Sequence, residues 1–110
     1  MEKIKFLVQG SAPEPYIVVF HKNGNNLTAQ CSCPAGENGM YCKHRFRIME
    51  GSNENIVSNN ISDVKLVATW LIGSDVEIAI KELKLAEDEL LLAKKKVSDY
   101  KKKLARKLID

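Results

Sequence analysis

The chain has 110 residues, of which 45% are hydrophobic and 28% charged, and its formal net charge is +3. This length suits one small domain with an extension rather than several domains. The mild charge does not by itself indicate nucleic acid. The longest apolar run, around Leu66 to Ile72, is shorter than the roughly 20 residues of a membrane span. We therefore expect a soluble, cytoplasmic protein with no membrane partner.

The first thirty residues predict a small antiparallel sheet. Residues 3–9 alternate apolar and polar side chains, which is typical of a strand with one buried face. Residues 16–21 are a continuous β-branched and aromatic run, which predicts a central strand buried on both faces. Asn23-Gly24 predicts a tight turn, because both residues tolerate positive φ, and residues 27–31 form the return strand.

All three cysteines and one of the two histidines lie between residues 31 and 44. They form a Cys-x-Cys pair, an eight-residue loop and a Cys-x-His pair. Three thiolates and one imidazole are a complete tetrahedral ligand set for zinc, which favours a structural site. Chance clustering of small buried residues is the alternative, and the odd cysteine count argues against disulfides. The predicted ligands of one structural zinc ion are Cys31, Cys33, Cys42 and His44.

The same stretch resembles a known family. The Cys-x-Cys…Cys-x-His pattern, with Cys-Pro-x-Gly from Cys33 and Cys-Lys-His from Cys42, is similar to the SWIM-type zinc finger. That family occurs in plant Mu-type transposases, bacterial Swi/Snf-type ATPases and some ubiquitin-pathway proteins. The resemblance covers about Pro15 to Glu50, and it implies a strand–strand–helix zinc module that binds DNA or proteins.

A helix predicted over residues 41–50 ends at Gly51. Residues 52–60 are polar and without periodicity, which predicts a linker between a zinc module at residues 1–51 and a helical extension at residues 61–110. We therefore expect an α+β fold. A β-hairpin or three-stranded sheet and a helix would surround one structural zinc, and a short helix and a long coiled-coil-like helix would follow.

The extension begins with a short helix at residues 62–72, capped by Ser62 or Asp63 and with Trp70 in the core. Ser74-Asp-Val-Glu77 matches a capping box and opens a long helix over residues 75–109, which contain no glycine or proline. A heptad seam of coiled-coil type runs along this helix at Leu83, Ala86, Leu90, Ala93, Val97, Tyr100 and Leu104.

The charges of the long helix are sorted. Residues 75–93 carry six acids and two lysines, a net −4, and residues 94–109 carry eight bases and one acid, a net +7. This sorting suits two antiparallel copies, each with its acidic half beside a basic half. We expect a homodimer through this helix, antiparallel rather than parallel. Packing within a monomer, another oligomer or a merely solvated face are the alternatives.

Basic residues beside the cysteines and at the end of the long helix predict a nucleic-acid-binding module, and the family resemblance implies DNA as the target. The alternative is a module for protein–protein interaction or dimerisation, or an inhibitory adaptor. An enzyme is not expected, since the ligand set is closed and no nucleophile–base set is visible. The candidate nucleic-acid contacts are Lys43, Arg45, Arg47, Lys95, Lys96, Lys102, Lys103 and Arg106.

Overall fold

The computed structural model describes residues 2–110 and divides into two compact units, Met1–Glu77 and Ile78–Asp110. Met1, the first residue of the predicted zinc module, lies outside the described residues. The first unit contains the sheet, the cysteines and the short helix, and the second contains most of the long helix. The first unit therefore contains residues 52–60 and the short helix as well as the sheet.

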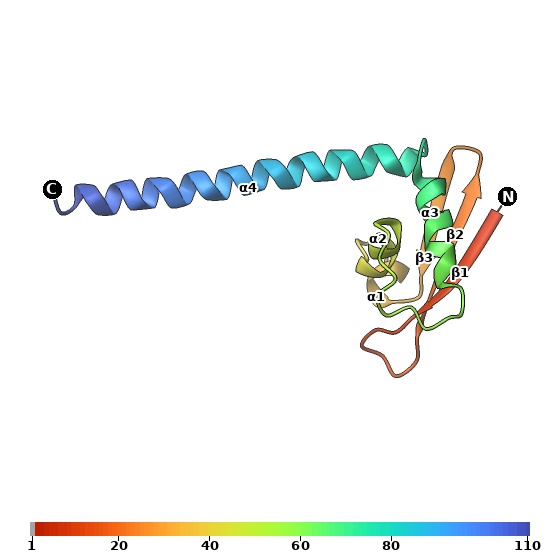
Figure 1. Cartoon of the computed structure of the whole chain (residues 1–110). Coiled ribbons are helices and arrows are strands. Elements are labelled where there is room, and N and C mark those ends of the chain that lie inside the picture. The colour runs from red at the N-terminus through yellow and green to blue at the C-terminus, as the bar shows by residue number, and fades with distance from the viewer. Residues whose placement is uncertain (1) are drawn as a thin grey trace. The chain divides into compact units, whose positions relative to one another are not determined.

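The described residues of the first unit form one sheet in the order β1-β2-β3, with both pairs antiparallel (Figure 1). The strands are β1 (Glu2–Val8), β2 (Tyr16–Asn23) and β3 (Asn26–Cys31). As predicted, β2 is the central strand. The prediction that both its faces are buried is wrong, since Ile17 is 42% exposed while Val18 is fully buried. Only one face of this sheet is covered, so an unbroken apolar run still alternates between core and solvent.

Helices follow the sheet in the chain. The described helical elements are α1 (Pro34–Glu37), α2 (Lys43–Met49), the 3-10 turn η1 (Ile61–Asp63), α3 (Val64–Leu71) and α4 (Asp75–Lys107). The short helix α1 was not predicted from the sequence, which indicated only turns there. The predicted mixture of sheet and helices is confirmed, and the fold is α+β.

The core of the first unit lies between one face of the sheet and the helices α2 and α3, which are in contact with each other. The rings of Phe6 and Phe20 meet edge to face, with centroids 6.0 Å apart. Ile48 of α2 and Trp70 of α3 are also buried. Trp70 therefore belongs to the core, as the sequence predicted.

Residues 52–60 are more than a linker. Ile56 forms an isolated antiparallel bridge with Val8 and is buried. The side-chain amide of Asn60 donates a hydrogen bond to the backbone carbonyl of Lys5 (2.8 Å). This segment therefore runs along the free edge of β1 and joins the sheet to α3.

The hairpin between β2 and β3 turns at Gly24 and Asn25, one position later than Asn23-Gly24 would place it. Gly24 alone has a positive φ (+60°) in this turn. The carboxylate of Asp75 accepts a hydrogen bond from the backbone N–H of Leu27 (3.0 Å), and the Asp75 N–H donates to the Asn25 carbonyl (3.0 Å). The first turn of α4 is thereby fastened to the hairpin within the first unit.

Ser74 caps α4 as predicted, but the return bond from Glu77 goes to the N–H of Gly73 rather than to that of Ser74. The backbone N–H of Glu77 donates to Ser74 Oγ (3.2 Å), while the Glu77 carboxylate accepts from the Gly73 N–H (3.3 Å). The predicted cap of the short helix is confirmed in position only. Among the described residues, Asp63 holds the N-cap position of α3 without a side-chain capping bond, and its carboxylate accepts from the Asn60 amide instead (3.3 Å).

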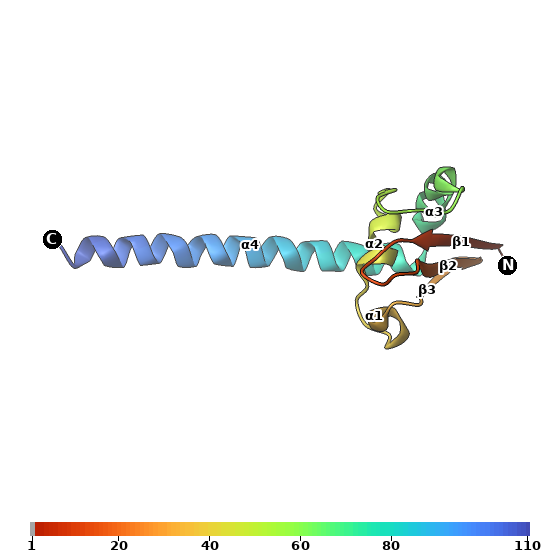
Figure 2. The ribbon, with the colours of Figure 1, turned by 90° about the horizontal axis from the view of Figure 1, so that it is seen from below.

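In the second unit α4 is one continuous helix (Figures 1 and 2). It ends at Lys107, two residues before the predicted end. All residues from Lys81 to Asp110 are exposed, including seam residues such as Leu90 (55%). Within residues 2–110 no helix combines the length and apolar character that a bilayer crossing needs.

Candidate metal centre

Three elements present the predicted zinc ligands. Cys31 is the last residue of β3, and Cys33 is the N-cap of α1. Cys42 is the N-cap of α2, and His44 lies in the first turn of that helix. The ligand pairs therefore sit at the end of a strand and at the starts of two helices, where backbone N–H groups are free to face an anion.

The ligand atoms converge. Cys33 Sγ and Cys42 Sγ are 3.4 Å apart, and His44 Nδ1 lies 3.5 Å from Cys42 Sγ and 3.8 Å from Cys31 Sγ. All four atoms lie within 4.8 Å of one another. Bond lengths of about 2.3 Å to sulfur and 2.0 Å to nitrogen separate the ligands of tetrahedral zinc by roughly 3.5–3.8 Å. The set fits one structural zinc ion, which Cys31, Cys33, Cys42 and His44 would hold.

Backbone N–H groups point at the sulfur atoms. The Gly36 N–H donates to Cys33 Sγ (3.3 Å). Burial raises the pKa of Cys31 to about 12, although the Cys33 N–H opposes this. Burial alone would raise the pKa of Cys42. Hydrogen bonds from the Arg45 N–H and the neighbouring thiols outweigh burial, so the pKa of Cys42 lies below its usual value. One thiolate is thus favoured by the fold alone, while Cys31 needs a cation beside it to ionise.

His44 is held as a neutral ligand. Its ring lies against Tyr16, with centroids 5.0 Å apart. Burial lowers the pKa of His44, and the positive charges of Lys43 and Arg47 lower it further. Zinc binds the neutral imidazole, so this environment favours the form that coordinates metal. A Cβ at Gly10 would collide with the Tyr16 ring and lie 3.3 Å from His44 Nε2.

Gly36 allows the loop after Cys33 to fold over the site. A Cβ at this position would lie 2.5 Å from the carbonyl oxygen of Cys31 and 2.8 Å from its Cβ. The sequence indicated a turn here, but its steric cause depends on how closely β3 and α1 approach each other.

Arg45, one of the predicted nucleic-acid contacts, is bonded to the backbone of the first unit. Its guanidinium donates to the carbonyls of Ala29 in β3 (3.1 Å) and Met40 in the loop before Cys42 (2.7 Å). These two bonds tie together the segments that carry Cys31 and Cys42. Arg45 thus supports the metal centre, and a local run of basic residues does not reveal this role.

Lys43 and Arg47 are exposed, unlike Arg45. They lie one turn apart on α2, on either side of His44 in the sequence. Both line a polar hollow of about 290 Å³ beside the metal ligands, together with Gln9, Gly10, Glu54 and other residues of the two adjoining loops. The remaining predicted contacts, Lys95, Lys96, Lys102, Lys103 and Arg106, lie on α4 in the second unit.

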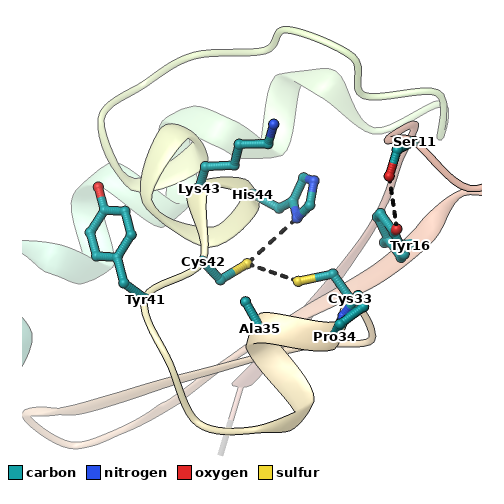
Figure 3. A pocket seen from close by; sticks show the side chains of 9 residues that line it. All are labelled: Ser11, Tyr16, Cys33, Pro34, Ala35, Tyr41, Cys42, Lys43 and His44. Carbon is teal, nitrogen blue, oxygen red and sulfur yellow. Dashed lines mark hydrogen bonds between the residues drawn. The ribbon is translucent and has the colours of Figure 1, made fainter.

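A second hollow, of about 560 Å³, opens beside the cysteines (Figure 3). Tyr16, Tyr41 and Lys43 line it together with Cys33, Cys42 and His44. Tyr41 is 65% exposed and stacks on Phe46, with centroids 4.4 Å apart and ring planes 6° apart. Neither tyrosine was predicted from the sequence as a functional residue. The aromatic residue directly before Cys42 is the one sequence feature that points to such a role.

A hairpin and two helix starts that present three cysteines and one histidine to a single point define a zinc-finger module. The family model described as the SWIM zinc finger matches residues 6–49, a span that contains all four ligands. This segment is therefore similar to SWIM zinc fingers, and its ligand set fits a zinc-stabilised binding module. No similar curated protein and no similar solved structure was found.

Proposed function

We propose that this zinc finger binds nucleic acid, with DNA as the target, through the exposed basic face of α2. The observation that carries the proposal is the position of Lys43 and Arg47. Residues four apart share one face of a helix, so both cations are presented together beside His44. Within residues 2–110, neither side chain donates to a backbone carbonyl as Arg45 does.

The hollow between these cations suits a phosphate group. Gln9 and Gly10 line it together with Lys43 and Arg47. Glu54 lines the same hollow and would repel an anion, so we place the phosphate nearer α2. Phosphate contacts of this kind supply most of the affinity and position a protein on the nucleic acid without reading its sequence.

Tyr41 adds a surface for a base. Its ring is exposed, its orientation is fixed by stacking on Phe46, and Lys43 lines the adjoining hollow. An aromatic ring beside a basic groove is the usual arrangement for binding single strands, because unpaired bases stack on the ring. We therefore expect single-stranded DNA to bind more tightly than duplex DNA at the same salt concentration.

One observation favours the alternative, a protein-binding or adaptor role. A mainly apolar hollow of about 280 Å³ is lined by Leu27, Met40, Phe46 and Met49, among others. Met40 at its edge is 65% exposed. Exposed methionine beside an apolar hollow adapts readily to a partner's side chains. This second function would use a different face from the one that carries Lys43 and Arg47.

The test is fluorescence anisotropy of a labelled single-stranded oligonucleotide and its duplex, titrated with the zinc-loaded chain at several salt concentrations. Removal of both cations by Lys43→Ala with Arg47→Ala should lower affinity at least tenfold. It should also reduce the slope of log affinity against log salt by about 1.4 to 1.8, since two phosphate contacts are lost. Lys3→Ala with Lys65→Ala, which removes two exposed lysines elsewhere in the unit, is the matched control.

The proposal is contradicted if the two double variants bind equally well with equal zinc content. Tyr41→Ala should weaken binding to the single strand more than to the duplex.

We assign binding rather than catalysis, because four protein ligands leave zinc no position for a substrate. The cytoplasmic location expected from the sequence stays a prediction, in keeping with thiols that must remain reduced to bind metal.

A further inference from the structure

The second unit presents an apolar seam along α4. Its large residues recur every seven positions at Leu83, Leu90, Val97 and Leu104, and their exposed fractions lie between 42% and 63%. The positions three residues after each of the first three are Ala86, Ala93 and Tyr100. Spacing of three and four residues keeps these side chains on one side of the helix, where a second helix can cover them.

We propose that α4 pairs in antiparallel direction with α4 of a second copy of this chain, in the register that sets Leu90 opposite Ala93 of the second copy. The seam from Ala79 to Leu104 would span about 38 Å at 1.5 Å per residue. This inference does not depend on the proposed binding of nucleic acid, because that proposal rests on Lys43, Arg47 and Tyr41 of the first unit and is tested by a different measurement.

The side-chain volumes favour this direction. In an antiparallel pair, each large residue of the seam faces one of the seam positions that lie between the large ones. In this register Leu90 meets Ala93, Val97 meets Ala86 and Leu104 meets Ala79. Each of these layers then joins a large residue with a small one, which fills space evenly. In a parallel pair leucine would meet leucine and alanine would meet alanine, so wide layers would alternate with gaps.

One layer of this register contains an aromatic residue. Leu83 would lie opposite Tyr100 of the second copy, at a mainly apolar hollow of about 510 Å³ on the surface of α4. The hollow is lined by Val97, Tyr100 and Leu104 together with Ala93, Lys96 and Lys101. It has the composition of a site that receives a knob from a facing helix, with apolar residues at its centre and lysine stems at its sides.

The charges beside the seam fix the same register. The residues just before the large seam positions are Glu82, Glu89, Lys96 and Lys103. With Leu90 opposite Ala93, Glu82 faces Lys103 of the second copy and Glu89 faces Lys96. The two-fold axis repeats both contacts, which gives four pairs of opposite charge. On the other side of the seam, Glu87 faces Lys94 twice more.

The parallel alternative fails on the same charges. It would place Glu82 beside Glu87 and Lys96 beside Lys101, and only the pair of Glu89 and Lys94 would attract. Like charges at such positions select against an arrangement, and opposite charges select for it. Volume and charge thus point independently to one direction and one register.

The candidate nucleic-acid contacts on α4 separate accordingly. Lys96 and Lys103 would lie in the dimer contact. Lys95, Lys102 and Arg106 lie on the opposite side of the helix and would stay open to solvent. The dimer therefore leaves a basic outer surface on each helix.

The test is a pair of charge-reversed variants of the full, zinc-loaded chain, measured by sedimentation equilibrium and native mass spectrometry. The first variant is Glu82→Lys with Glu89→Lys, and the second is Lys96→Glu with Lys103→Glu. Each alone should dimerise at least about tenfold more weakly than the unaltered chain, since four attractive pairs become repulsive. Mixed together they should form a heterodimer, because every altered pair is again of opposite charge.

Two controls separate the seam from general effects of charge and folding. Lys95→Glu with Lys102→Glu makes the same charge change on the outer side and should leave the dimer intact. If circular dichroism shows that a charge variant has lost helix, Leu90→Glu is compared with Leu91→Glu, whose site is 69% exposed and outside the seam. Only the seam substitution should abolish dimerisation.

Three results would overturn the proposal. The unaltered chain could remain a monomer at about 100 μM, a concentration at which even weak specific pairs associate. The two charge variants could fail to combine. The second variant could associate more strongly than the unaltered chain. That result would indicate a parallel pair, because there Lys96→Glu turns the repulsive contact with Lys101 into an attractive one.

Discussion

The guanidinium of Arg45 donates a hydrogen bond to the backbone carbonyl of Met40 at 2.7 Å, two residues before the ligand Cys42. A second bond reaches the Ala29 carbonyl, two residues before the ligand Cys31. One side chain therefore spans the two segments that must stay in register for the four ligands to meet. Support of this kind from outside the ligand set commonly decides metal affinity.

We expect Arg45→Lys to weaken zinc binding about 10- to 100-fold, because an ammonium group cannot reproduce a planar fork that donates to two carbonyls. The measurement is competition for zinc against a chromophoric chelator. Arg47→Lys, an exposed position on the same helix, is the control and should leave zinc affinity unchanged. Equal affinities for the two variants would contradict the supporting role of Arg45.

Cys33→Ser should remove zinc and unfold the first unit. Metal binding supplies about 10–16 kcal/mol in small zinc modules, which is comparable with the whole stability of a small domain. The helical signal of α4 should largely persist, since that helix lies mostly in the second unit. Elemental analysis and near-ultraviolet circular dichroism provide the measurement. A variant with full zinc content and an unchanged melting temperature would refute the prediction. Ser32→Ala, which removes the hydroxyl that accepts from the Ile17 N–H but no metal ligand, is the control and should keep its zinc.

Gly36→Ala should lower both zinc affinity and thermal stability. The added methyl group would press on the backbone of Cys31, and relief of that contact would move either β3 or α1. We expect a loss of about 1–3 kcal/mol, the usual range for overpacking, measured by denaturant unfolding of the zinc-loaded chain. Glu37→Ala, at an exposed position of α1, should cost much less. Equal losses would show that the approach to Cys31 is not the cause.

Zinc should be released as the pH falls. Because burial holds the pKa of His44 below its usual value, the unfolded chain gains this proton at a higher pH than the folded chain. The stability contributed by neutral His44 is therefore complete above the unfolded pKa of about 6.5, and it declines as the pH falls through the folded value. Coordination adds to this effect in the same direction. Metal released between pH 7.5 and 5 is measured with a colorimetric chelator.

The control for this titration is His21→Gln. His21 lies in β2 outside the ligand set, so its removal should leave the zinc-release curve unchanged. Full retention of zinc at pH 5 would count against His44 as the group that titrates. A zinc-release curve shifted by His21→Gln would do the same.

Asp75→Ala should destabilise the first unit by about 1–3 kcal/mol. The substitution leaves the Leu27 N–H without its carboxylate acceptor at the hairpin and removes an acid from the first turn of α4. Chemical unfolding followed by tryptophan fluorescence suits the measurement, since Trp70 is buried in that unit. Asp88→Ala, at an exposed position of the second unit, is the control. An equal loss of stability in this variant would show that the hydrogen bond of Asp75 is not the cause.

Several features of the fold and the site could be predicted because they depend on neighbouring residues. The spacing of Cys31, Cys33, Cys42 and His44 specifies a zinc ligand set wherever the chain can turn. The capping box at Ser74 and the good helix formers after it specify a long helix without help from other elements. Such signals act over a few residues, where chain geometry leaves few alternatives.

What the sequence by itself determined is therefore the ligand set, the three strands and the longer helices, and the seam of α4. Only the tertiary structure decided that the sheet is covered on one face, that residues 52–60 run along β1, and that Arg45 supports the metal centre while Lys43 and Arg47 stay exposed. The physical reason is that burial and hydrogen-bond partners arise between residues far apart in the chain. Identical basic side chains acquire different roles according to which distant carbonyls lie within their reach.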